Sequence, residues 1–168
     1  MKLINKREIL EIITPVIDTV CESLGLIAVE VTFTQESGRH FVRIYIYNPK
    51  QPVSHTDCEN VTRKLADYLD ELIPVNYYLE VSSPGLERKL KTEKEYLIFQ
   101  HKKVHVKLKK ELEDEKLKVF DARIEDYSEE KGLSLKIIDL NKVITVKHSD
   151  ISTIQLIFEQ HIKGENND

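Results

Sequence analysis

The first apolar pattern along the chain has the spacing of an amphipathic helix. Asn5, with Glu8 three residues later, resembles a capping box, and Gly25 is typical of the position after a helix end. The apolar positions between them are Ile9, Ile12, Ile13, Val16, Val20 and Leu24. We therefore expect a helix to about Ser23, with a kink or a late start because Pro15 lacks a backbone donor.

From Leu26 the apolar positions alternate with polar ones, as in a strand with one buried face. The first such run has Val29, Val31 and Phe33 on one face. Ser37-Gly38 then provides a turn. In the second run Val42, Ile44 and Ile46 alternate with Arg43, Tyr45 and Tyr47. The pattern predicts a β-hairpin.

A second helix is predicted after Pro52, where Ser54 and Asp57 have the spacing of a helix cap. Its expected inner face is Cys58, Val61, Leu65, Leu69 and Leu72. Ile73-Pro74 ends this helix, because the helical region is disfavoured for a residue before proline. A strand follows, whose apolar face consists of Tyr77, Leu79 and Val81. The order is α-β-β-α-β, which allows two helices to cover one face of a three-stranded sheet.

Short strands dominate the second half of the chain. Thr92 and Glu95 form a capping box for a short helix over about 92–100. Five candidate strands follow, over residues 104–108, 119–124, 133–137, 143–146 and 151–157. Closely spaced short strands indicate a small barrel, because a closed sheet hides its edges in a short chain. The last residues, 163–168, are polar and expected to be frayed.

The run from Leu79 to Arg88 joins a strand to a turn, since Pro84 presets φ and Gly85 is free to adopt positive φ. This Leu-Glu-Val-Ser-Ser-Pro-Gly-Leu-Glu-Arg run resembles a block found between the two domains of the bacterial ribosome maturation factor P (RimP) family. The resemblance implies an α+β protein with a KH-like N-terminal domain, residues 1–86, and a small SH3-like or Sm-like β-barrel, residues 87–168. One departure is Lys89, which stands where the family usually has proline, so rigidity between the domains is not carried over.

The same resemblance implies a non-catalytic factor that binds the immature 30S small ribosomal subunit and promotes its maturation. Its partners would be 16S rRNA and a small-subunit ribosomal protein near the decoding region. No apolar run approaches the roughly 20 residues of a membrane helix, and the first ten residues lack the features of a signal peptide. We therefore expect a cytoplasmic protein. We also expect a monomer.

Charge is distributed unevenly, although the whole chain has a net charge of only −4. Residues 88–110 carry nine Lys or Arg side chains against two acidic ones, whereas residues 111–130 carry nine acidic against three basic. The basic run is either a solvated surface balanced by its acidic neighbour or an rRNA phosphate contact. His101 and His105 lie inside it and would gain charge near a polyanion. The candidate ribosome contacts are Arg88, Lys89, Lys91, Lys102, Lys103, Lys107 and Lys109. The acidic segment then suits a basic ribosomal protein.

A second candidate set is the interdomain motif itself. For Glu80, Glu87 and Arg88 an interdomain salt bridge competes with direct rRNA contact. The serines are expected to hydrogen-bond backbone groups in the turn. The full set is Glu80, Ser82, Ser83, Pro84, Gly85, Glu87 and Arg88.

The cluster of four tyrosines has two interpretations. Tyr45, Tyr47, Tyr77 and Tyr78 have the composition of a base-stacking surface, with half of them facing the helices, but tyrosine is also common in strands and no Gly-x-x-Gly clamp is present. A free adaptor for messenger or small RNA is therefore the main alternative function.

Catalytic chemistry has little support in the sequence. No phosphate-binding glycine loop, zinc-protease motif or Gly-x-Ser-x-Gly is present, so no enzyme, cofactor or metal is expected. Cys21 and Cys58 are expected to act as small buried hydrophobes. An enzymatic function would depend on Ser82 or Ser83.

Overall fold

The computed structural model describes residues 4–159. The chain divides into two compact units, residues 1–84 and residues 85–168. We describe each by itself. The expected frayed tail, residues 163–168, lies outside the described residues.

The N-terminal unit begins with helix α1, Lys6–Ser23, which is capped by the predicted asparagine. The Asn5 side chain accepts hydrogen bonds from the backbone N–H groups of Arg7 and Glu8, which satisfies two donors at the helix start. The expected late start is wrong, because the helix is continuous from Lys6 through Pro15. Thr19 Oγ1 donates to the Pro15 carbonyl at 2.9 Å.

The predicted hairpin is confirmed as β1, Ile27–Glu36, paired antiparallel with β2, Arg39–Tyr47. Ser37 and Gly38 both adopt positive φ, of 48° and 77°, which suits the tight turn between them. A register shift between Ala28 and Glu30 leaves Val29 as an extra residue in β1. Val29 therefore does not share a simple alternation with the apolar positions that follow it.

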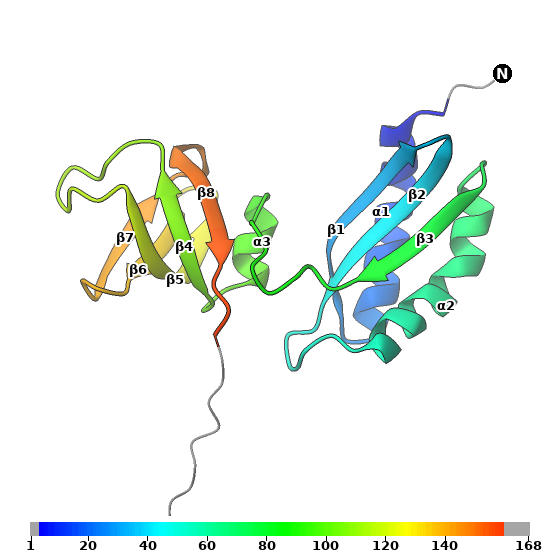
Figure 1. Ribbon diagram of the computed structural model, residues 1–168, viewed down its shortest axis with the longest axis horizontal. Helices are drawn as coiled ribbons and strands as arrows, with labels where there is room; N and C mark the ends of the chain where they lie inside the picture. The colour runs from blue at the N-terminus through cyan, green and yellow to red at the C-terminus, as the bar shows by residue number, and fades with distance from the viewer. Residues whose placement is uncertain (1–3, 160–168) are drawn as a thin grey trace, which may run out of the picture. The chain divides into compact units, whose positions relative to one another are not determined.

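Helix α2, His55–Leu72, begins with a reciprocal capping box between Ser54 and Asp57 and leads to β3, Tyr77–Ser82. β3 pairs in parallel with β2, so the sheet order is β1-β2-β3. Both helices lie on one face of this sheet (Figure 1) and form the core with it. The predicted α-β-β-α-β order is confirmed, and no element of residues 4–84 covers the other face of the sheet.

Within residues 85–159 the C-terminal unit consists of one short helix, one 3-10 helix and a five-stranded sheet. The helix predicted near residue 92 is α3, Glu93–Ile98. The strands are β4 Lys103–Leu108, β5 Val119–Ser128, β6 Gly132–Ile137, β7 Lys142–Val146 and β8 Ile151–Leu156. They pair antiparallel in the order β7-β6-β5-β4-β8. No helix in residues 4–159 is long and apolar enough to span a membrane.

The predicted closed barrel is not observed. β7 and β8 are the two ends of the sheet order, and within the described residues no ladder joins them. Four strand spacings of about 4.8 Å would separate these strands in a flat sheet. The 3-10 helix His148–Asp150 is nearly the whole connection between them, and it rises only about 2 Å per residue. The sheet must therefore curl strongly, although hydrogen bonds do not close it.

Candidate nucleic-acid interface

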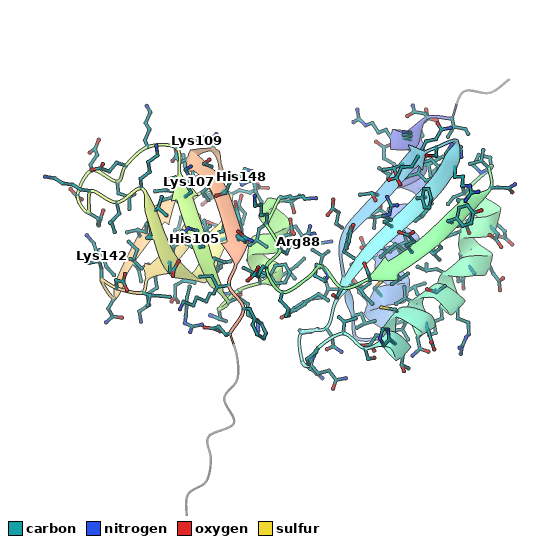
Figure 2. All side chains as sticks on the ribbon, in the orientation of Figure 1. Arg88, His105, Lys107, Lys109, Lys142 and His148 are labelled. Atoms are coloured by element: carbon teal, nitrogen blue, oxygen red, sulfur yellow. The ribbon has the colours of Figure 1, made fainter. Side chains whose placement is uncertain are left out.

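Strand β4 presents basic side chains on the exposed face of the C-terminal sheet. Val104 and Val106 are fully buried, whereas the alternate residues His105 and Lys107 are exposed and Lys103 is half-buried. This confirms the predicted alternation along the strand. Lys109 is exposed just beyond the strand end (Figure 2).

Two acidic side chains lie beside this face of β4, Asp121 on β5 and Glu159 after the end of β8. His105 lies opposite Asp121 of β5, and its Nδ1 is 2.7 Å from the Asp121 carboxylate. Lys103 lies opposite Arg123, whose Nη2 is 2.7 Å from Glu159 Oε1. The acidic side chains thus lie against His105 and Arg123, and no carboxylate within residues 4–159 pairs with the lysines of β4.

Three lysines remain available for an outside partner. Among residues 4–159, the side chains of Lys103, Lys107 and Lys109 form no salt bridge with a carboxylate. Lys102 is exposed in the turn before β4. Ammonium groups without a protein partner are the ones that exchange counterions for nucleic-acid phosphates. The lysine face of β4 means Lys103, Lys107 and Lys109 below.

The remaining candidates of the basic run lie elsewhere in the unit. Arg88 is buried, and its Nε donates to the Glu95 carboxylate at 2.5 Å. This removes Arg88 from the surface, so we leave it out of the proposed contact. Lys89 and Lys91 follow Arg88 in the chain and are exposed. The backbone of Lys89 forms an isolated antiparallel β-bridge with Gln155 of β8.

The motif between the units contributes to both of them separately. Glu80 of β3 accepts a hydrogen bond from Arg43 of β2 at 2.7 Å, so its partner lies in its own unit. The Glu87 carbonyl accepts from Gln155 Nε2 at 2.9 Å in the C-terminal unit. Gly85 has a φ of +86°, as the expected turn requires.

The two serines of the motif make no visible turn bonds. Ser82 ends β3 and Ser83 follows it, with Pro84 next. Within residues 4–159 neither serine side chain forms a hydrogen bond, so the expected bonds to backbone groups are absent. Both side chains are exposed.

One acidic residue of the segment after β4 is paired with the sheet. Glu115 forms an ion pair with Lys142 of β7. The hydrogen bond lowers the pKa of Glu115 and raises that of Lys142, so both groups stay charged at neutral pH. The contact ties the loop between β4 and β5 to the far side of the sheet.

The tyrosine cluster is divided between the two faces of the N-terminal sheet. Tyr77 is half-buried and its hydroxyl donates to Asp70 of α2 at 2.7 Å; burial is the main reason that the pKa of Tyr77 is raised. Tyr78, Tyr45 and Tyr47 lie on the opposite, helix-free face. Phe41 lies on this face too and was not among the predicted residues, although the alternation along β2 indicates its position.

The cysteines do not form a metal site with their neighbours. Cys21 is fully buried and Cys58 is half-buried, where burial raises the pKa of its thiol. Within residues 4–159 no group of three or more His, Cys, Asp or Glu side chains is arranged to hold a metal ion.

A family comparison identifies the N-terminal unit. The family model of the RimP N-terminal domain matches residues 16–87. The matched segment contains all three strands of the first sheet, helix α2 and the motif from Leu79 to Glu87. This match assigns residues 16–87 to the RimP N-terminal domain and supports membership of the chain in the RimP family of ribosome maturation factors.

Proposed function

We propose that this protein is a non-catalytic ribosome biogenesis factor that binds the immature 30S subunit and promotes its maturation. The family match supports a ribosomal role. The observation that carries the proposal further is the lysine face of β4, where three ammonium groups lack a carboxylate partner among the described residues. Such a surface suits rRNA, whose phosphates attract cations without regard to sequence.

The lysine face is the proposed rRNA contact. Lys103 and Lys107 lie on the same side of β4 with His105 between them, and Lys109 lies just beyond the strand, so the three ammonium groups follow one strand direction. Lys102, in the turn before β4, and the exposed Lys89 and Lys91 elsewhere in the unit are further candidate contacts. The proposed partners are 16S rRNA and a small-subunit ribosomal protein near the decoding region, met by a cytoplasmic monomer.

The fold assignment of the two units is part of the proposal. The α-β-β-α-β order supports a KH-like N-terminal domain over residues 1–86. The curled five-stranded sheet supports an Sm-like or SH3-like relationship for residues 87–168, without a closing ladder. Neither likeness by itself confers RNA binding. The lysines therefore carry the functional argument.

A charge-reversal experiment tests the lysine face. The triple variant K103E/K107E/K109E is compared with K6E/K50E/K64E, which makes the same charge change at exposed positions of the N-terminal unit. Affinity for 30S precursors is measured between about 50 and 200 mM salt.

We expect the β4 variant to bind more weakly and to flatten the slope of log affinity against log salt by about 2 to 3, because each lost phosphate contact removes roughly 0.9 from the slope. The control should keep the wild-type slope. An equal change in both variants would show only an effect of net charge, and no change in the β4 variant would exclude this face from the interface.

A further inference from the structure

The helix-free face of the N-terminal sheet carries two adjacent aromatic rings. Phe41 of β2 and Tyr78 of β3 are register partners in the parallel pair. Their ring centroids are 5.5 Å apart, and the ring planes are inclined by 28°. Tyr78 is 53% exposed. The two rings are thus stacked against each other, because cross-strand side chains in register lie side by side.

Both rings already hold a cation over one face. Arg39 Cζ lies 5.6 Å from the centroid of the Tyr78 ring. Arg43 Cζ lies 4.7 Å from the centroid of Phe41. These distances are within the range of cation–π attraction. The rings are therefore oriented so that guanidinium groups stack on them.

Carboxylates border the same rings. Glu36 Oε1 and Oε2 accept from the Arg43 guanidinium at 2.6 and 3.0 Å, and Glu80 Oε2 accepts from its Nε at 2.7 Å. The Arg43 hydrogen bond lowers the pKa of Glu36, so this carboxylate stays ionised. Glu30 lies on the same face, opposite Tyr45. Two arginines and three glutamates give the face an excess of negative charge.

The charge of the whole unit has the same sign. Residues 1–84 contain twelve acidic and eight basic side chains. An acidic surface with exposed rings attracts cationic side chains and repels phosphates. This charge pattern favours a basic polypeptide over single-stranded RNA, although aromatic surfaces on sheets bind RNA bases in other proteins.

We propose that this face accepts an arginine- or lysine-rich segment of a protein partner, with a cationic side chain taking the place of Arg39 over the Tyr78 ring and its charge balanced by Glu36 and Glu80. The inference deepens the proposed function and rests on it for the class of partner, a basic ribosomal protein. It assigns protein recognition to the N-terminal sheet and rRNA recognition to the lysine face of β4.

Binding of a defined basic peptide tests this assignment. The probe is a short fluorescein-labelled peptide of alternating arginine and glycine, and fluorescence anisotropy measures its affinity for the full chain. Tyr78→Leu removes the ring but keeps an apolar side chain. The matched control is Tyr68→Leu on α2, since Tyr68 is 55% exposed in the same unit and lies outside the sheet.

We expect Tyr78→Leu to weaken peptide binding about two- to fivefold, the loss expected for one exposed cation–π contact. Tyr68→Leu should bind as the wild type does. Glu80→Gln should also weaken binding, with the largest effect at low salt because screening is weakest there. Equal affinities for the Tyr78→Leu and Tyr68→Leu variants would overturn the proposal.

Oligouridylate distinguishes the competing RNA-binding role. If oligouridylate binds, and Tyr78→Leu weakens oligouridylate binding but not peptide binding, the face stacks bases and the proposal is wrong. The assay contains no ribosomal particles, so its result is separate from 30S binding. If the protein binds 30S precursors normally but shows no Tyr78-dependent peptide binding, this inference is wrong and the proposed function stands.

Discussion

Arg88 and Glu95 form a buried ion pair within the C-terminal unit, with Nε and Oε1 2.5 Å apart and side chains only 7% and 1% exposed. The other Glu95 oxygen accepts the backbone N–H groups of Lys91 and Thr92 at 2.7 and 2.9 Å. One carboxylate therefore binds the segment before α3 and also caps the helix. The charge of Arg88 serves this contact, which is why we give it a structural role.

Substituting Glu95 by alanine is expected to destabilise the C-terminal unit. Removing one partner of a buried pair leaves the other charge uncompensated, which typically costs about 3–5 kcal/mol. Urea unfolding followed by circular dichroism measures the loss. Glu11→Ala is the control, since it breaks the exposed Arg7–Glu11 pair and should cost no more than about 0.5 kcal/mol. Similar losses in the two variants would contradict the structural role of the buried pair.

Local sequence patterns predicted the elements and the β1–β2 hairpin, but not the contacts between residues that are distant in sequence. Capping residues such as Asn5, Ser54 and Thr92 mark helix starts because each bonds within a few residues of itself. Arg88 is buried because it pairs with Glu95. A count of charges along the basic run includes both residues but does not show that they pair. For the same reason, the count did not distinguish the lysines of the lysine face from Arg88, whose charge is already paired.

The sheet closure and the aromatic face depend on contacts that are distant in sequence. Closing a barrel needs a ladder between β7 and β8, and alternation within a strand does not specify its neighbours. The Phe41–Tyr78 pair arises from the parallel register of β2 and β3, which are separated by α2. Alternation did place Tyr77 and Tyr78 on opposite faces of the sheet, as expected.

Gly132 is expected to be intolerant of alanine. It has a φ of +90°, and an added Cβ would lie 2.5 Å from the Val146 carbonyl oxygen. Gly38 is the control, since it has a φ of +77° with open space around it. Both variants incur the left-handed strain of about 1–2 kcal/mol, but only Gly132→Ala adds a backbone clash. Thermal unfolding should therefore show a larger loss for Gly132→Ala, and equal losses would show that β6 and β7 adjust without cost.

Tyr96 is expected to make stability decline at alkaline pH. The side chain is 1% exposed and its hydroxyl lies 2.7 Å from His148 Nδ1. Burial raises the pKa of Tyr96 to about 12. Because the folded pKa is above the unfolded value of about 10, stability is fully present below pH 10 and is lost as pH rises towards 12.

The variant Tyr96→Phe should weaken this alkaline loss. Between pH 10 and 12 its unfolding free energy should fall less steeply than that of the wild type, by up to about 1.4 kcal/mol per pH unit. Urea unfolding over this range measures the difference, and exposed Tyr68→Phe is the control. Parallel pH profiles for wild type and Tyr96→Phe would show that Tyr96 ionises as easily in the folded state as in the unfolded state.

Co-sedimentation with ribosomal particles tests the central proposal most directly. The purified chain is mixed at physiological salt with immature small subunits, mature small subunits, large subunits or naked single-stranded RNA. We predict binding that is confined to small subunits and strongest on immature ones. Binding only to naked RNA would contradict the account and favour an RNA adaptor, and equal binding to large and small subunits would reduce the lysine face to a non-specific cation surface.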